Sequence, residues 1–188
     1  MRIITGSAKG LKLKTQQGFS TRPTSDRVKE SLFSILNGMK NFSEVETVLD
    51  IFAGTGALGI ESLSRGAKSA IFTDNATAEI ISENVRRAKF EKVSKIFKGD
   101  FEKVLRKISR ENLKFDLIFS DPPYRKNFSQ MTADFVAELE LLKPDGILII
   151  EHGFDEKIIL PKSLELLRNV IYGKTTEIEL IGLKGEEI

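Results

Sequence analysis

Residues 48–59 of the chain read VLDIFAGTGALG, and this stretch decides the fold. An apolar strand is expected over Thr47–Phe52, and a helix is expected to run from the glycines to about Arg65. The glycines of Gly54-Thr55-Gly56 permit a tight turn and let a ligand approach the backbone closely. The stretch therefore predicts a nucleoside-binding loop, with a purely structural turn as the alternative.

Strands and helices continue to alternate after this loop. Further strands are expected at Ser69–Thr73, Ser94–Lys98, Phe115–Ser120 and Ile147–Glu151, and near residues 165–171 and 175–182. Helices are expected at Thr77–Lys89, about 101–109 and Phe128–Leu142, with a turn at Pro144-Asp145-Gly146. The alternation predicts an α/β fold with a mostly parallel sheet covered on both faces, and the two consecutive final strands predict an antiparallel pair near one edge.

The N-terminal segment is basic. A short hairpin is expected from Arg2–Thr5 and Leu11–Lys14, followed by a loop and a helix capped by Thr24 or Ser25. Eight lysines and arginines against two acids give residues 1–40 a net charge of +6, whereas the whole chain carries +2. A basic arm on an otherwise acidic body favours a polyanionic partner, and a solvated surface is the alternative.

Length and composition limit the number of domains and the classes of site that the chain can form. A chain of 188 residues is one domain of ordinary size, which we divide into a hairpin and loop extension, 1–24, and a main domain, 25–188. The chain has no cysteine and one histidine, His152, which we expect to be structural, so no metal site is predicted. No apolar stretch approaches the roughly 20 residues of a membrane span, and a cytoplasmic protein is expected.

Two acidic residues indicate which nucleoside the loop binds. Asp74 ends the second strand, 20 residues after Gly54, where a carboxylate accepts hydrogen bonds from ribose hydroxyls. Asp50 precedes the glycines and would repel a pyrophosphate but suit the cationic S-adenosylmethionine; its alternative role is to hold the glycine turn.

The end of the third strand completes the predicted cofactor site. Asp100 is placed to accept from an adenine amino group, and Phe101 to pack on the adenine ring. Alternatively, Asp100 caps the next helix, and both roles are compatible because a cap uses one oxygen. The predicted cofactor-binding residues are Asp50, Ala53, Gly54, Gly56, Gly59, Asp74, Asn75, Asp100 and Phe101.

The motif Asp121-Pro122-Pro123-Tyr124 follows the fourth strand and predicts the chemistry. Two prolines stiffen the loop, since each fixes φ near −65°. The Asp121 carboxylate and the Pro122 carbonyl can each accept one N–H of an amino group, which aims the nitrogen lone pair at a methyl donor, while Tyr124 offers a stacking face. The motif predicts methylation of an exocyclic amino group of a base.

Basic residues near these motifs are candidates for binding nucleic-acid phosphates. Arg125 and Lys126 directly follow the catalytic motif, and the others belong to the basic arm. The predicted RNA-binding residues are Lys9, Lys12, Lys14, Arg22, Arg27, Arg125 and Lys126.

Four segments together resemble one bacterial enzyme family, the RsmD-type 16S rRNA guanine-N2 methyltransferases. Val48–Ala67 is similar to the family's cofactor motif, and Asp121–Tyr124 stands where the family has its catalytic loop. Arg2–Leu13 resembles its N-terminal hairpin, and Arg22–Phe33 resembles its next signature. The similarity runs from residue 2 to about 151.

The resemblance implies a class I S-adenosylmethionine-dependent methyltransferase fold, with a seven-stranded sheet whose last strand is antiparallel. It also implies methylation of one guanine in 16S rRNA, within an assembled or assembling small subunit. The chain departs from the family at two places. Asp74 stands where the family usually has Glu, and Ser7-Ala8-Lys9 replaces a usual Trp-Arg, which leaves the hairpin loop one positive charge and no stacking ring.

Three alternatives remain open. A DNA adenine-N6 methyltransferase shares the Asp-Pro-Pro-Tyr motif but usually adds a target-recognition domain, and no segment here is long enough to form one. An RNA-binding assembly factor without activity would not need an intact Asp121–Tyr124 loop. A dinucleotide oxidoreductase would have no use for that loop and would need a substrate domain.

Overall fold

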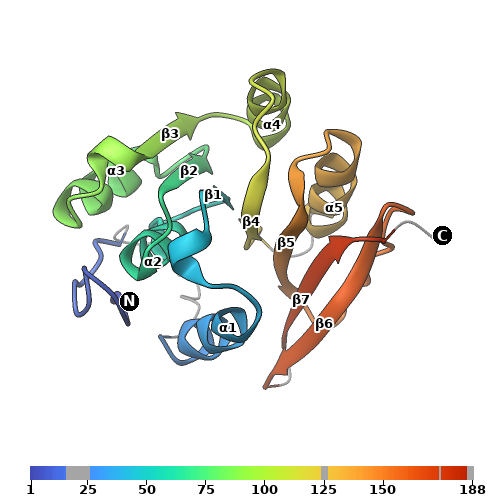
Figure 1. Cartoon of the computed structure of the whole chain (residues 1–188), viewed down its shortest axis with the longest axis horizontal. Coiled ribbons are helices and arrows are strands. Elements are labelled where there is room, and N and C mark those ends of the chain that lie inside the picture. The colour runs from blue at the N-terminus through green and yellow to red at the C-terminus, as the bar shows by residue number, and fades with distance from the viewer. Residues whose placement is uncertain (16–25, 124–126, 174, 186–188) are drawn as a thin grey trace.

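The computed structural model describes residues 1–15, 26–123, 127–173 and 175–185. Within these residues, seven strands form one sheet in the order β3-β2-β1-β4-β5-β7-β6 (Figure 1). β7 runs antiparallel to both neighbours and the other pairings are parallel, which confirms the predicted fold class. The strands are β1 Thr47–Ile51, β2 Ser69–Asp74, β3 Ser94–Lys98, β4 Phe115–Ser120, β5 Leu142–Gly153, β6 Leu164–Tyr172 and β7 Thr176–Leu183.

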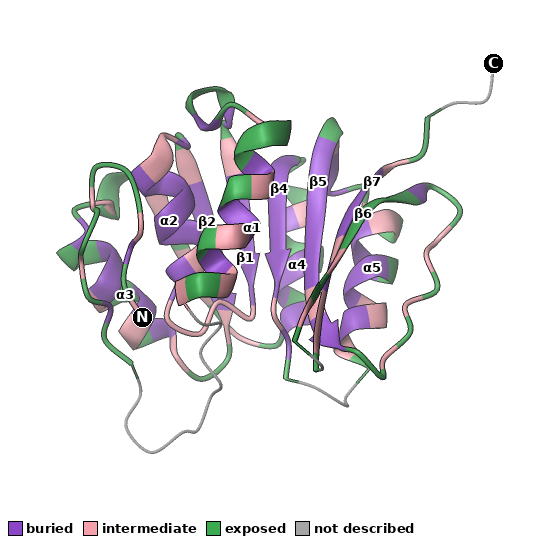
Figure 2. Cartoon of the chain, turned by 90° about the horizontal axis from the view of Figure 1, so that it is seen from below, coloured by how far each residue is buried: buried purple, intermediate pink, exposed green. Residues whose placement is uncertain are grey.

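Helices cover both faces of the sheet. They are α1 Asp26–Met39, α2 Ala57–Arg65, α3 Ala78–Arg87, α4 Phe101–Arg110 and α5 Phe128–Glu138, with 3-10 turns at Phe42–Glu44 and Glu91–Val93. One apolar core lies under α1, α2 and α3, and a second lies under α4 and α5. β4 lies between the two cores and is buried along its whole length (Figure 2). None of the described helices is long and apolar enough to cross a membrane.

The strand order reverses between β3 and β4: β2 and β3 are added on one side of β1, and β4 is added on its other side. β1 is paired with β2 on one side and with β4 on the other, and Ile51 lies opposite Ser120 at the carboxyl ends of β1 and β4. Ligands of open α/β sheets bind at such a switch point, outside the carboxyl ends of the strands. The fold therefore brings the glycine loop after β1 and the Asp121 loop after β4 to the same edge.

The structure corrects the boundaries predicted around Pro144. α5 ends at Glu138, earlier than expected, because Glu140 adopts a left-handed conformation with φ 48°. β5 already begins at Leu142, and the predicted turn at Pro144-Asp145-Gly146 is an irregularity inside this strand. There the pairing with β4 moves from Phe115↔Leu142 to Leu117↔Ile147, so residues 143–146 stand outside the register.

The predicted N-terminal hairpin is present, but its strands are reduced to one bridge between Arg2 and Lys12. Ile3 and Leu13 insert into the core under α1, α2 and α3. The Glu61 carboxylate of α2 accepts the backbone N–H groups of Ile4 and Thr5, at 2.8 and 3.0 Å. The hairpin is therefore held both by its own backbone hydrogen bonds, such as that from the Ile3 N–H to the Leu11 carbonyl at 3.0 Å, and by the Glu61 side chain.

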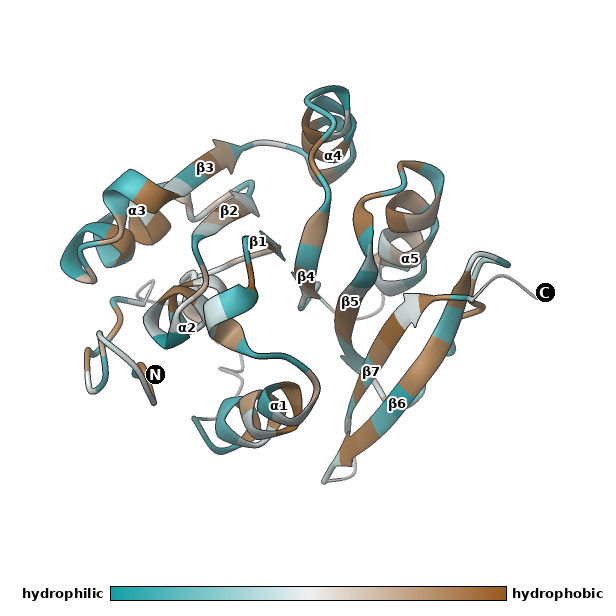
Figure 3. Ribbon diagram, viewed as in Figure 1, coloured by the Kyte–Doolittle hydropathy of each residue, from teal (hydrophilic) through white to brown (hydrophobic). Residues whose placement is uncertain are grey.

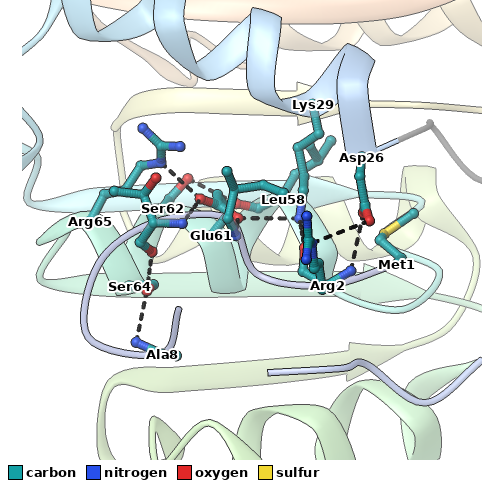
Figure 4. Close-up of polar contacts among 12 residues, drawn as sticks. Met1, Arg2, Ala8, Asp26, Lys29, Leu58, Glu61, Ser62, Ser64 and Arg65 are labelled. Atoms are coloured by element: carbon teal, nitrogen blue, oxygen red, sulfur yellow. Dashed lines mark hydrogen bonds and ion pairs between the residues drawn. The ribbon is translucent and has the colours of Figure 1, made fainter. Parts of the chain in front are cut away.

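A buried ionic cluster fixes this hairpin to the domain (Figure 4). Glu61 and Lys29 are both fully buried, with 3.2 Å between Oε2 and Nζ, and Lys29 also donates to the Arg2 carbonyl at 2.6 Å. The Arg65 Nε lies 2.9 Å from Glu61 Oε1. Burial lowers the pKa of Lys29, and Glu61 opposes that effect. The cluster links α1, α2 and the hairpin at one carboxylate.

Candidate active site

The glycine loop is a series of left-handed backbone conformations. Phe52, Gly54 and Gly56 have φ of 55°, 55° and 77°, and the Gly56 N–H closes the turn on the Ala53 carbonyl at 2.7 Å. Gly59 serves packing, because a Cβ there would lie 2.3 Å from the Phe72 ring of β2. The glycines thus provide the tight turn that the sequence predicted, and Gly59 also allows a close approach of helix to sheet; the predicted close approach of a ligand stays a prediction.

Asp50 lies inside the sheet. It is buried on β1, and its Oδ2 accepts the Gly59 N–H at 2.9 Å, so it holds the first turn of α2 to the strand. Burial raises the pKa of Asp50 to about 8, and the nearby Asp74 contributes in the same direction. This contact corresponds to the structural role kept open for Asp50, and it leaves Oδ1 as a further acceptor.

Asp74, at the end of β2, binds the glycine loop and the segment before α3. Its Oδ2 accepts the Gly54 N–H at 3.0 Å, and its Oδ1 accepts the N–H groups of Ala76 and Thr77 at 2.8 and 2.9 Å. A carboxylate has about four lone-pair positions, so three of them are engaged. The remaining position is on Oδ2, beside the glycine loop, and Asn75 next to it is exposed.

Asp100 is the N-cap of α4, as one of its two predicted roles requires. Its Oδ1 accepts the Lys103 N–H at 3.2 Å, and the residue is exposed. Phe101 differs from its predicted role, because its ring is only 6% exposed. It packs in the core against Phe52, Phe128 and Phe135, with centroids 5.0, 5.6 and 5.7 Å away, instead of offering an open face to a ligand.

Phe52 is a site residue that the sequence analysis missed. It adjoins Ala53 of the glycine loop, is half-buried, and packs on Phe101 and on Phe128, at 5.0 and 5.3 Å. Its left-handed backbone is unusual for a bulky residue, and such strain tends to occur at functional sites. Phe52 therefore joins the glycine loop to the start of α5, where the catalytic loop ends.

The structure describes the beginning of the Asp121 loop and its contact with α5. Asp121 is half-buried, Pro122 buried and Pro123 exposed. Before the loop, Ser120 Oγ lies 3.1 Å from Thr132 Oγ1 of α5, and Thr132 donates to the Phe128 carbonyl at 2.8 Å. Tyr124, Arg125 and Lys126 lie outside the described residues, so the stacking and phosphate roles given to them stay predictions.

Four of the predicted RNA-binding residues lie in the part of the chain that the structure describes: Lys9, Lys12, Lys14 and Arg27. Lys9 lies in the hairpin turn that docks on Ser64 near the end of α2, since the N–H groups of Ser7 and Ala8 bind Ser64. Lys14 lies near the glycine loop, because Asn84 binds the backbone of both Lys14 and Thr55, and its amine pairs with Glu83 at 2.6 Å. Lys9, Lys12, Lys14 and Arg27 are exposed, and Arg22 lies outside the described residues.

The fold and the site together define the class of protein. A sheet in which β7 is inserted antiparallel between β5 and β6 differs from the 3-2-1-4-5-6 order of dinucleotide-binding enzymes. It is the sheet of class I S-adenosylmethionine-dependent methyltransferases, and the solved methyltransferase structures that superpose on this chain agree. Within this class, the chain belongs to the family described as Conserved hypothetical protein 95, whose sequence profile matches residues 1–180.

Individual relatives support this membership along nearly the whole chain. The Bacillus subtilis (strain 168) protein YlbH is 36% identical over 180 residues, which cover 93% of this chain and 95% of that protein. The Haemophilus influenzae protein named ribosomal RNA small subunit methyltransferase D is 34% identical over 182 residues, 92% of this chain and 89% of that protein. The solved structure of yhhF from Escherichia coli has a TM-score of 0.83 and 27% identity, and covers 98% of both chains.

Proposed function

We propose that this protein transfers a methyl group from S-adenosylmethionine to the exocyclic N2 amino group of a guanine in 16S rRNA. One observation carries the proposal: Ile51 and Ser120 are register partners, so the glycine loop and the Asp121-Pro122 loop leave the sheet side by side. A methyl donor held by the first loop would be next to an amino group held by the second.

The residues of the first loop suit S-adenosylmethionine, which supplies an electrophilic methyl group. The free position on Asp74 Oδ2 would accept one ribose hydroxyl, and Asn75 is placed to assist. Asp100 uses Oδ1 for its cap and has Oδ2 for an adenine amino group. Asp50, whose pKa is raised to about 8, has a buried carboxyl that a nearby cationic ligand would stabilise in its ionised form.

The residues of the second loop would hold the target. The Asp121 carboxylate and the Pro122 carbonyl would each accept one N–H of the amino group, which orients the nitrogen lone pair. Because positioning drives the displacement, no strong general base is needed; the proton leaves after the nitrogen has become cationic. Tyr124 would stack on the base, which is worth about 1–3 kcal/mol per base.

The substrate class follows from the relatives and from charge. The Haemophilus influenzae relative is named a small-subunit rRNA methyltransferase, and the other named relatives with that description cover a similar share of the chain. The exposed lysines of the hairpin and Arg27 offer phosphate contacts. Guanine N2 follows from the family resemblance, and the small subunit or an assembly intermediate, in the cytoplasm, is the expected particle.

The test is to identify the methylated nucleoside. The protein is incubated with methyl-labelled S-adenosylmethionine and, separately, naked 16S rRNA, small subunits and duplex DNA; each product is then digested to nucleosides. We expect labelled N2-methylguanosine from an RNA-containing sample and no label in DNA. Labelled N6-methyladenine in DNA would favour the DNA methyltransferase, and no label in any sample would favour the inactive assembly factor.

A further inference from the structure

Three potential metal ligands meet at the carboxyl end of β5. His152 lies on β5, and Glu177 and Glu179 lie on the antiparallel β7, where His152 is the register partner of Glu177. One ligand atom from each side chain lies within 4.8 Å of the other two. The group belongs to neither the glycine loop nor the Asp121 loop.

The imidazole of His152 is oriented as in a metal ligand. Its Nδ1 lies 3.0 Å from the Gly153 carbonyl, and because a carbonyl only accepts, Nδ1 carries the proton. In the neutral ring, Nε2 then has a free lone pair. The side chain is 1% exposed, and Nε2 has no hydrogen-bond partner among the residues that the structure describes. Metal-bound histidines usually donate their other ring N–H to a backbone carbonyl or a carboxylate in this way.

The lone pair of Nε2 faces two carboxylates, so three acceptor groups converge at this point. Glu179 Oε1 is 3.7 Å from Nε2, which is too long for a hydrogen bond even if the ring is protonated. Glu177 has one oxygen bound to the Asn169 amide, which fixes the orientation of its carboxylate.

We propose that His152, Glu177 and Glu179 bind one divalent transition-metal ion, with zinc as the best match. One imidazole and two carboxylates are a common donor set for zinc, with metal–ligand distances of about 2.0–2.2 Å. Small side-chain rotations would bring ligand atoms that are already within 4.8 Å of one another onto one such ion. A single ion would satisfy all three acceptors, whereas one proton cannot.

The ion would link β5 to β7 at the edge that carries the catalytic loop. Ile150, two residues before His152, is the register partner of Ser120, which directly precedes Asp121. The site would thus fix the end of β5 and the C-terminal hairpin of β6 and β7 relative to that loop. This role is independent of the proposed methyl transfer.

The test is metal binding by the untagged, EDTA-treated full chain, measured by calorimetry with zinc chloride. Competing sites are few, because the chain has no cysteine and one histidine. We expect one zinc ion per chain and a rise in Tm of roughly 5–10 °C at a free zinc concentration about 100-fold above Kd. In the unmodified protein, zinc should also shift the NMR signals of the only histidine ring, a result that requires no variant.

Matched variants assign the ligands. Two variants remove ligands with little change in side-chain size: the single variant His152→Gln, and the double variant Glu177→Gln with Glu179→Gln. Each should weaken zinc binding at least tenfold. Glu165→Gln removes an exposed carboxylate from the same hairpin and should bind zinc normally. Absence of binding by the wild type, zinc binding without a shift of the histidine signals, or undiminished binding by His152→Gln would each overturn the proposal.

Discussion

Each acidic residue in the candidate cofactor site already binds backbone N–H groups of the protein. Asp50 holds Gly59, Asp74 holds Gly54 and the start of α3, and Asp100 caps α4. The sequence located these residues because acids at the ends of parallel strands follow a short pattern. It could not predict how many lone pairs remain for a ligand, since that depends on loop geometry.

The first prediction concerns Asp74. Asp74→Ala removes both the ribose acceptor and the bond to Gly54, so we expect at least a tenfold weaker affinity for S-adenosylmethionine, measured by calorimetry, with the fold intact by circular dichroism. Loss of the bonds to the N–H groups of Ala76 and Thr77, just before α3, should also lower stability, by about 1 kcal/mol for each bond. Thr77→Ala is the control, because Thr77 makes no side-chain cap bond. Unchanged affinity in Asp74→Ala would remove this residue from the site.

The second prediction concerns pH. Asp50 is protonated below its pKa of about 8, and a bound cation favours the ionised form. Cofactor binding below pH 8 must therefore release a proton, so affinity should rise as the pH increases from 6 to 8. Calorimetry across this range should give a smaller rise for Asp50→Asn, which can still accept the Gly59 N–H. Equal pH dependence in the two proteins would show that the ionisation of Asp50 is not coupled to cofactor binding.

At the scale of secondary structure, the sequence pattern located each strand of the sheet and each α-helix in the described residues, but neither of the two 3-10 helices. The predictions fail where contacts between distant segments determine the local structure. The composition of residues 143–146 predicts a turn, but these residues are contained within β5. The hairpin was predicted, but its bonds to Glu61 of α2 were not. The aromatic contacts of Phe52 and the buried Lys29 also depend on packing between distant segments, which local patterns do not encode.

The third prediction concerns the element contacts made by Glu61. Glu61→Gln removes the charge that compensates the buried Lys29, and loss of one partner of a buried ion pair typically costs roughly 3–5 kcal/mol. Urea unfolding should show this loss of stability. Glu83→Gln, which removes the exposed partner of Lys14, should leave stability nearly unchanged. A stable Glu61→Gln protein would mean that the buried ion pair is not needed to hold the hairpin to the domain.

At the scale of the whole molecule, charge and exposed apolar surface are unevenly distributed. The hairpin lies along α2, with Lys9 near the far end of that helix and Lys14 near the glycine loop. The opposite edge of the sheet is β6, where Leu166, Leu167 and Ile171 are exposed and apolar residues are visible in Figure 3. An RNA that reaches the site should therefore approach from the side of the hairpin and α1.

The fourth prediction concerns this approach. Each phosphate contact contributes about −0.7 to −0.9 to the slope of log affinity against log salt. Changing Lys9, Lys12 and Lys14 together to Gln should flatten the slope for RNA or subunit binding by about 2 units, because Lys14 is already paired with Glu83. Cofactor affinity should not change. A wild-type salt slope in the triple variant would place the RNA elsewhere on the molecule.

The proposed function gives the two loops separate roles: the glycine loop binds the cofactor, and the Asp121 loop holds the target amino group. The most direct measurement compares Asp121→Ala and Tyr124→Ala with the wild type, by single-turnover methyl transfer to the identified RNA and by calorimetric affinity for S-adenosylmethionine. We predict that both variants lose most or all of the methyl transfer and keep nearly the wild-type cofactor affinity. Cofactor affinity that collapses together with activity, or methyl transfer that persists in Asp121→Ala, would contradict the account.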